Sequence, residues 1–267
     1  MPGIQDILEF LSEFAPLTLA ESWDNVGLLL GDSGGSADRI MTCLTLTPNV
    51  AAEAIREGAQ LVVTHHPILF QATKRITRET PAGAMLLDLI RADVAVYSPH
   101  TAFDSAESGI NQQLAERCGL LNIQPLRPAD SDQFPTGIGA GRLGYLPEPV
   151  SCELFVSRLL GALQLPGCDV VPTDRPVKRV GIACGSAAEF LPDAARAGCD
   201  LFVTGEARFH ATLDALEQGI GMILLGHYAS ERFALETLAE LLTQQFPEIT
   251  AWASRDERDP VTRFSRP

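Results

Sequence analysis

The sequence predicts an α/β fold in two similar halves, each containing a sheet flanked by helices. Short β-rich runs alternate with helical patterns along the 267 residues, which is typical of strands covered by helices. Several positions of the first half recur in the second half at a constant offset of 140 residues. In addition, four of the five histidines lie just after predicted strands or within one turn of such a point. Open α/β sheets bind their ligands at the carboxyl ends of strands.

Apolar spacing and glycine positions predict the elements of the first half, residues 1–125. Gln60-Leu-Val-Val-Thr64 is a continuous apolar run of the kind that is buried on both faces of a sheet. The expected elements, in order, are a helix at 4–11, strands at 26–30 and 40–46, a helix at 50–57, a strand at 60–64, a helix at 84–90, a strand at 94–97 and a helix at 111–118.

Residues 124–136 are rich in Pro, Asp and Ser and are the best candidate linker. The second half, residues 126–267, then repeats the pattern. Its expected elements are a helix at 151–163, strands at 169–171 and 179–184, a helix ending near 198, strands at 200–204 and 221–225, and a long helix that begins near 227. The last helix buries a stripe formed by Ala234, Leu235, Leu238, Leu241 and Leu242.

Six positions of the first half match the second half at the same offset, and a histidine follows a later strand in both halves. Glycine caps and apolar strands recur in all α/β units, so chance can produce some of these matches. The constant offset favours an ancient duplication. The matching residues are Ala54, Arg56, Gly58, Leu61, Val63 and Thr64 in the first half and Ala194, Arg196, Gly198, Leu201, Val203 and Thr204 in the second.

The composition is that of an ordinary globular protein, with 46% hydrophobic and 20% charged residues. The net charge of −14 disfavours non-specific binding to nucleic acid or to an anionic membrane surface, because both are negatively charged. The six cysteines form no CxxC pair and are expected to be reduced and buried. The N-terminus lacks a signal-peptide pattern, and no apolar run approaches the roughly 18 residues of a membrane span. We therefore expect a cytoplasmic protein.

Two pairs of potential metal ligands follow strands of the first half. His65 and His66 come directly after the apolar strand and before Pro67, where the imidazoles could reach one site or two adjacent sites. The alternatives are a chance pair of histidines in a loop, or one histidine that caps a backbone carbonyl. His100 and Asp104 follow the next strand, and their four-residue spacing places both on one face of a helix. Such a carboxylate can ligate a metal or orient a histidine, although an Asp that caps the helix is also common.

The second half carries two comparable segments. His227 and Glu231 have the same four-residue spacing at the start of the last helix, where Glu231 could also simply stabilise the helix dipole. Glu206 and His210 lie in the segment that matches the His-His pair, with Glu206 at the position of His66. Imidazoles and carboxylates together suit borderline divalent metals. The carboxylates favour a two-metal site, because one bridging carboxylate can hold two ions about 3.5–4 Å apart. The sequence contains no HExxH and no P-loop motif.

These segments, in this order, resemble the family named for the NGG-one-interacting factor three of yeast, whose members are often labelled GTP cyclohydrolase 1 type 2. The resemblance covers nearly the whole chain. It implies two similar α/β halves that face each other across a dinuclear metal cleft, and assembly into a homohexamer. The segments that carry it are Glu21-Ser-Trp-Asp-Asn-Val-Gly-Leu28, Val63-Thr-His-His-Pro67, His100-Thr-Ala-Phe-Asp104, Ser108-Gly-Ile-Asn111, Thr204-Gly-Glu206 with His210, and Gly226-His-Tyr-Ala-Ser-Glu231.

The resemblance also implies two divalent ions per chain, of Zn, Fe, Mn, Co or Ni, with Glu231 bridging both. It implies that His100, Glu206 and His210 line the same cleft, and we interpret these three as orienting or proton-transfer groups. The segment Cys184-Gly-Ser-Ala-Ala188 departs from relatives, which commonly carry a glycine-richer turn, and this argues against a close backbone approach to a ligand there. The implied metal ligands are His65, His66, Asp104, His227 and Glu231.

Two functions from different classes fit these residues. The first is a metal-dependent hydrolase, in which a hydroxide activated by two metal ions attacks an electrophilic carbon or phosphorus of a nucleotide-like small molecule. The family label implies GTP as that molecule. The second is a non-catalytic protein that binds or delivers metal, or an oligomeric scaffold. A purely structural metal fits poorly, because structural zinc sites are usually closed and rich in cysteine, and no cysteine lies in these motifs.

Overall fold

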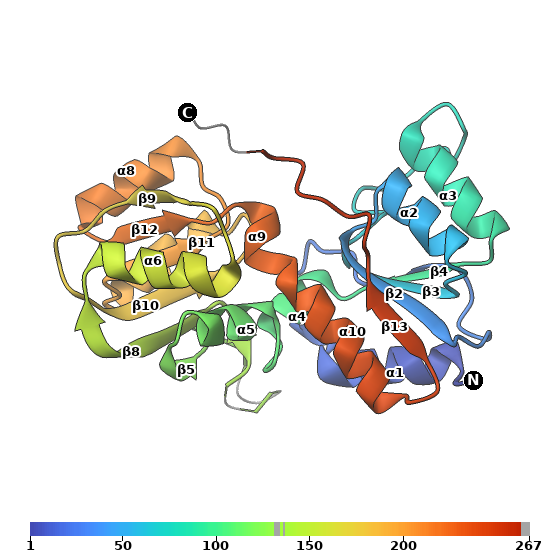
Figure 1. The fold of residues 1–267 in the computed structure, drawn as a ribbon, viewed down its shortest axis with the longest axis horizontal. Helices are drawn as coiled ribbons and strands as arrows, with labels where there is room; N and C mark the ends of the chain where they lie inside the picture. Colours follow the sequence, from blue (N-terminus) through green and yellow to red (C-terminus); the bar gives the residue numbers. More distant parts are fainter. Residues whose placement is uncertain (131–133, 136, 263–267) are drawn as a thin grey trace. The chain divides into compact units, whose positions relative to one another are not determined.

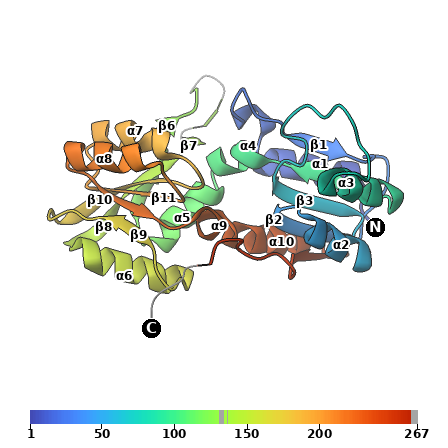
Figure 2. The same cartoon turned by 90° about the horizontal axis from the view of Figure 1, so that it is seen from above.

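The structure, a computed structural model, describes residues 1–130, 134–135 and 137–262 (Figures 1 and 2). The chain forms two compact units, and each of them is mixed α/β. Unit 1 contains Met1–Glu13, Glu21–His100 and Leu235–Pro267, whereas unit 2 contains Phe14–Ala20 and Thr101–Ala234. The boundary that the sequence pattern suggests, between residues 125 and 126, lies inside unit 2. The reason is that β5 (Leu121–Gln124) pairs with β8 (Arg142–Val150), which ties the residues before 125 to those that follow.

Unit 1 is a five-stranded sheet between two layers of helices. Its strands are β1 (Gly27–Leu30), β2 (Arg39–Thr45), β3 (Leu61–His66), β4 (Ala95–Ser98) and β13 (Thr250–Ala253). Its helices are α1 (Ile4–Phe14), α2 (Pro48–Arg56), α3 (Pro81–Arg91) and α10 (Phe233–Gln245). The strand order is β1-β4-β3-β2-β13, in which only the β1–β4 pair is antiparallel. Helices α2 and α3 cover one face of the sheet, and α1 and α10 cover the other (Figure 1).

Local sequence explains how α2 forms and packs against β3, the strand that ends in His65 and His66. Thr47 caps α2 by accepting a hydrogen bond from the backbone N–H of Val50, and Pro48 is pre-organised for the first turn. The apolar face of α2 packs on β2 and β3, where Met41 and Val62 are fully buried. Every residue of β3 before His66 is buried, as expected for a central parallel strand.

Unit 2 is a six-stranded sheet, also with helices on both faces. Its sheet order is β5 (Leu121–Gln124), β8 (Arg142–Val150), β10 (Val177–Ala183), β11 (Leu201–Thr204), β12 (Gly221–Leu224) and β9 (Asp169–Val171). A separate short ribbon pairs β6 (Arg127–Pro128) with β7 (Gly139–Ala140). The helices are α4 (His100–Ser105), α5 (Ile110–Arg117), α6 (Cys152–Leu163), α7 (Leu191–Arg196), α8 (Phe209–Gln218) and α9 (His227–Glu231), with 3-10 turns at Leu17–Leu19 and Ala188–Phe190. Helices α7 and α8 lie on one face of the sheet and α6 on the other (Figure 2).

Four strands of each sheet share their order and direction, and the two central pairs also share their register. Residues 40–43 of β2 pair with 61–64 of β3, and residues 180–183 of β10 pair with 201–204 of β11, so that both strands are offset by 140. In each sheet a third parallel strand follows, and an antiparallel strand then forms the edge. A side-chain oxygen just before the second strand accepts two backbone N–H groups of the first: Gln60 Oε1 from residues 38 and 39, and Asp200 Oδ2 from residues 178 and 179.

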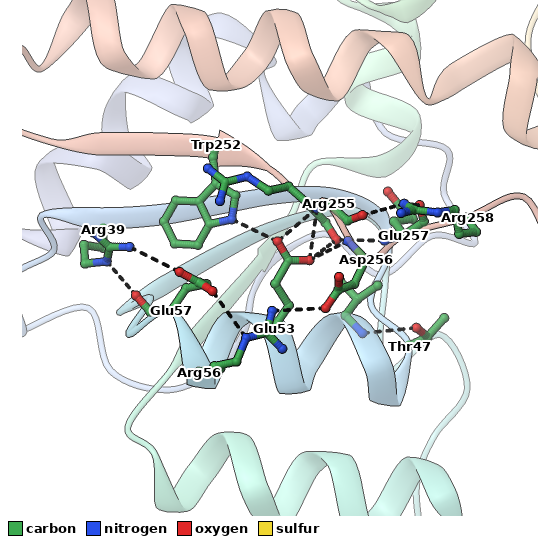
Figure 3. A network of polar contacts seen from close by, with 12 residues as sticks. Arg39, Thr47, Glu53, Arg56, Glu57, Trp252, Arg255, Asp256, Glu257 and Arg258 are labelled. Atoms are coloured by element: carbon green, nitrogen blue, oxygen red, sulfur yellow. Dashed lines mark hydrogen bonds and ion pairs between the residues drawn. The ribbon is translucent and has the colours of Figure 1, made fainter.

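A buried carboxylate fixes the segment that follows β13 (Figure 3). Glu53 of α2 is 1% exposed and accepts hydrogen bonds from Trp252 Nε1 at 3.2 Å and Ser254 Oγ at 2.6 Å. The backbone N–H groups of Arg255 and Asp256 donate to the same carboxylate, each at 2.9 Å. Burial opposes ionisation of Glu53, but these hydrogen bonds outweigh it and lower its pKa.

The structure confirms the mixed α/β architecture and most of the expected elements, with three differences. The sequence pattern misses β5, β7, β8 and β13, and β8 is missed because Gly144, Pro147 and Pro149 lie within it. The candidate linker contains β6, while residues 131–133 and 136 of it lie outside the described residues. The long helix expected from residue 227 is interrupted at Arg232 and forms α9 and α10. In the described part of the chain, no helix has the length and apolar character needed to cross a membrane.

Candidate metal centre

Three imidazoles gather at the carboxyl ends of two neighbouring strands in unit 1. His65 and His66 end β3, and His100 lies two residues after the end of β4, its parallel neighbour. One ring nitrogen of each histidine lies within 4.8 Å of the corresponding atoms of the other two. The ring centroids are 5.0 to 5.7 Å apart. The arrangement can hold a metal ion, because imidazole nitrogens are good ligands for Zn, Fe, Co and Ni.

Neighbouring side chains fix the orientation of two of these rings. His66 Nδ1 lies 2.7 Å from Thr45 Oγ1, and His100 Nδ1 lies 2.7 Å from Asp24 Oδ1. The side chain of Asp24 is fully buried. Metal-ligating histidines usually have one ring nitrogen held in this way by an oxygen, which sets the tautomer and the ring plane. His100 also has φ +30, a strained backbone value of the kind that clusters at functional sites.

In unit 2, the helix spacing of α9 brings His227 and Glu231 together. His227 Nε2 lies 3.2 Å from Glu231 Oε2, and its Nδ1 lies 3.0 Å from Glu206 Oε1. Glu231 is buried, whereas Glu206 is exposed. The hydrogen bond with Glu231 raises the pKa of His227 to about 9, against the opposing effect of burial, and Glu206 adds to the rise. His227 is therefore protonated at neutral pH in the ion-free protein, so a metal ion that binds it must displace a proton.

Asp104 of α4 belongs to the same unit and is held by two other side chains. Cys184 Sγ donates to Asp104 Oδ1 at 3.2 Å, and Asn111 Nδ2 donates to the Asp104 carbonyl oxygen at 3.1 Å. Asn111 Oδ1 in turn accepts the backbone N–H of Cys184 at 2.8 Å. Burial, together with the charges of Asp104 and Glu231, raises the pKa of Cys184 well above its ordinary value. The sulfur is therefore a neutral thiol that donates to the carboxylate.

The lack of a side chain at Gly185 leaves space for the carboxylate of Glu231. This glycine has φ +66, and a Cβ at this position would lie 2.3 Å from Glu231 Oε1. Its backbone N–H donates to Ser230 Oγ at 3.0 Å. The turn at residues 184–188 therefore keeps a glycine where the backbone passes closely by a carboxylate, although the rest of that turn is poor in glycine.

His210 stands apart from these residues within unit 2. It is the second residue of α8, its side chain is exposed, and its ring contacts Phe209 with centroids 6.0 Å apart. Among the described contacts of unit 2, it touches neither His227 nor Glu231. The structure thus groups His65 with His66 and His100 in unit 1. In unit 2 it groups Glu206 with His227 and Glu231, and it ties Asp104 to Cys184.

Comparison with known proteins places this chain in a family. A family model described as Duf34/NIF3 (NGG1p interacting factor 3) matches residues 2–260. The chain belongs to the Duf34/NIF3 family. A GTP cyclohydrolase 1 type 2 homolog of Clostridium perfringens is 31% identical over 261 residues, covering 96% of this chain and 98% of the relative. The NIF3 homolog of Schizosaccharomyces pombe is 33% identical over 258 residues, covering 91% and 92%. The fold is that of a NIF3-related Bacillus cereus crystal structure, with TM-score 0.92, 21% identity and 99% of both chains covered.

The candidate site contains further residues whose roles are not apparent from the sequence alone. Asp24 orients His100 and Thr45 orients His66, while Cys184 and Asn111 hold Asp104. Asp24 and Asn111 lie in segments that carry the family resemblance, which marks the segments but does not reveal these contacts. Thr45 is the register partner of His66 across the β2–β3 pair, and that register was the information missing from the sequence.

Proposed function

We propose that this NIF3-family chain binds two divalent metal ions and acts as a metal-dependent hydrolase on a nucleotide-like small molecule. The proposed ligands are His65 and His66 of unit 1 and Asp104, His227 and Glu231 of unit 2, with Glu231 as the bridging carboxylate. The observation that carries the proposal is the imidazole cluster of unit 1, whose ligand atoms lie within 4.8 Å of one another.

The residues fit a divalent ion chemically. Imidazole nitrogens and carboxylate oxygens are the ligands that Zn, Fe, Mn, Co and Ni take in hydrolytic sites. The contact of Thr45 Oγ1 with His66 Nδ1 is of the kind expected around a ligating imidazole. A bound ion would act as a Lewis acid, polarising the reacting carbon or phosphorus centre and lowering the pKa of water.

Three further residues are proposed to orient ligands or move protons. His100 is paired with the buried carboxylate of Asp24, which supports the imidazolium that forms when the ring accepts a proton. Glu206 holds Nδ1 of His227 and so orients that ring. His210 is exposed at the start of α8, where it can exchange protons with solvent, and we propose it as a proton-transfer group.

The substrate class rests on the relatives and on charge. The Clostridium perfringens relative is named a GTP cyclohydrolase 1 type 2 homolog, which supports a nucleotide as the substrate here. The net charge of −14 would repel a polyphosphate, and bound divalent cations would offset the negative potential locally.

We also propose that the two units arose by internal duplication and that the chain assembles as a homohexamer. The duplication is supported by the shared strand order and by the register offset of 140 in both β2–β3 and β10–β11. The hexamer rests on the family resemblance, and the mass of the purified protein by light scattering tests it.

Metal content and GTP turnover test the proposed function together. Wild type, Glu231→Gln and the exposed control Glu217→Ala are each reconstituted with Zn, Mn, Fe or Co, and circular dichroism verifies their folding. We expect two ions per chain and turnover in wild type and Glu217→Ala, and a loss of both in Glu231→Gln. Equal metal content and equal residual activity in all three proteins would refute the assignment. Bound ions that exchange readily with a chelator and pass to an apo-acceptor, without turnover, would favour metal delivery instead.

A further inference from the structure

Two large aromatic side chains of unit 1 are exposed beside the imidazole cluster. The side chain of Trp23 is 59% exposed and that of Phe70 is 50% exposed. Aromatic side chains of this size usually bury most of their surface, and exposed apolar groups that gather in one place often mark a binding site. The two rings contact each other with centroids 5.9 Å apart and an interplanar angle of 75°.

Hydrogen bonds hold the two segments that carry these rings. Asn25 Nδ2 donates to the carbonyl oxygen of Leu69 at 2.7 Å, which ties the segment that carries Trp23 to the segment that carries Phe70. Asp24, between Trp23 and Asn25, is bonded to His100 and accepts the backbone N–H of Asn25. A platform that is already ordered loses little entropy when a ligand binds to it.

The same contacts place the pair next to the proposed chemistry. The ring centroids of Trp23 and Phe70 lie 6.2 Å and 6.3 Å from that of His100, and both rings meet it edge to face. The two aromatic rings are close to perpendicular, so that together they present two surfaces at a steep angle to each other. A flat ring can stack on one of them while its edge meets the other, with its remaining atoms close to His100.

We propose that Trp23 and Phe70 form the stacking site for the planar heteroaromatic ring of the substrate, a ring of nucleobase size. The inference rests on the proposed function in one respect, that the substrate is nucleotide-like. Stacking on aromatic side chains is the usual way in which proteins bind a base without reading its identity, because every base presents a flat π face. The pair therefore selects for a flat heteroaromatic ring and orients it, and neither side chain takes part in proton transfer.

Fluorescence distinguishes this site from the rest of the protein. The chain has only two tryptophans, and Trp252 is 8% exposed with its indole N–H bonded to Glu53. The probe is guanosine, which has the heteroaromatic ring but no phosphate, and ribose is the matched compound without the ring. We expect saturable quenching by guanosine and none by ribose. Phe70→Ala weakens guanosine binding about tenfold, as loss of one stacking partner predicts, whereas the exposed control Phe209→Ala leaves it unchanged.

Equilibrium dialysis with labelled guanosine measures the same affinities without relying on tryptophan emission. Trp23→Phe keeps a ring and is expected to bind within about threefold of wild type, whereas Trp23→Ala binds about tenfold more weakly. Unchanged affinity in both alanine variants, or quenching by ribose equal to that by guanosine, would overturn the proposal. So would a fall in the mass of the assembly in the alanine variants, because the pair would then lie at a contact between copies. Metal content and turnover are measured separately, so failure of the hydrolase assignment is distinct from failure of the stacking site.

Discussion

Replacement of Glu53 by alanine is expected to lower the free energy of unfolding by about 2–6 kcal/mol. The carboxylate accepts hydrogen bonds from four donors, of which Trp252 Nε1 and Ser254 Oγ belong to buried residues. Those two donors lose their acceptor without gaining water, and each such loss costs about 1–3 kcal/mol. The backbone N–H groups of Arg255 and Asp256 belong to exposed residues, and water can replace their acceptor. Glu53→Gln keeps one acceptor oxygen, so a loss of about 2 kcal/mol is expected.

The contribution of Glu53 also depends on pH in a definite direction. Its pKa is lower in the folded protein than the ordinary value of 4.5, so the unfolded chain binds the proton more tightly. The stabilisation is therefore fully present above pH 4.5 and is lost as the pH falls through the folded pKa. The difference in stability between wild type and Glu53→Gln should shrink on acidification.

Urea denaturation followed by far-UV circular dichroism measures these differences as shifts of the midpoint at constant slope. Glu57→Gln is the matched control, because Glu57 follows the same helix and its carboxylate forms ion pairs with the exposed side chains of Arg39 and Arg56. Its change should stay within about 1 kcal/mol. A loss below about 1 kcal/mol in Glu53→Ala, or a Glu53→Gln difference that does not change with pH, would refute the reasoning.

Three further predictions follow from the buried groups of unit 2 and from the metal proposal. Gly185→Ala should abolish metal binding, because the new Cβ would clash with Glu231. Gly198→Ala is the control, since Gly198 has a similar φ of +71 and no close contact, and it should lose only about 1–2 kcal/mol of stability. Metal analysis and urea denaturation check both variants. Arg142 donates to three backbone carbonyls and to Gln112, and burial lowers its pKa to about 10. Arg142→Met should therefore lower the free energy of unfolding by about 3 kcal/mol in urea denaturation. The control Arg91→Met, at an exposed residue, should lower it by less than about 0.5 kcal/mol. A chelator should lower the Tm of wild type by about 5 °C or more in a thermal melt and leave Glu231→Gln unchanged. An equal shift in both proteins would contradict metal binding through Glu231.

Much of the fold could be predicted from the sequence, because the central parallel strands are continuous apolar runs. Residues 61–64 and 201–204 are buried along their whole length, and their patterns need no tertiary information. Strand β8 could not be found in this way, since Pro147 and Pro149 break its pattern. These prolines lie beyond Leu143 and Tyr145, which pair with both β5 and β10, so the strand tolerates them. Strand β13 is only four residues long and follows α10 after the short connection at residues 246–249, which leaves it little periodicity.

The candidate site was likewise predictable from the sequence only in part. His65, His66 and His100 could be predicted as neighbours, because they follow parallel strands whose carboxyl ends meet at one sheet edge. The residues that orient these imidazole rings could not be predicted from the sequence. Thr45 reaches His66 through the β2–β3 register, and Asp24 reaches His100 from a turn more than 70 residues earlier in the chain. Neither contact leaves a local trace in composition or spacing.

The interleaving of the two units has a consequence for biosynthesis. The residues of unit 2 all precede residue 235, whereas unit 1 receives its edge strand β13 from residues 250–253. A growing chain therefore carries every residue of unit 2 while the outer edge of β2 still has no partner strand. An open edge of this kind is a template for wrong pairing with another chain. Unit 1, although it starts first, therefore completes its sheet only when residues 250–253 are available to pair with β2.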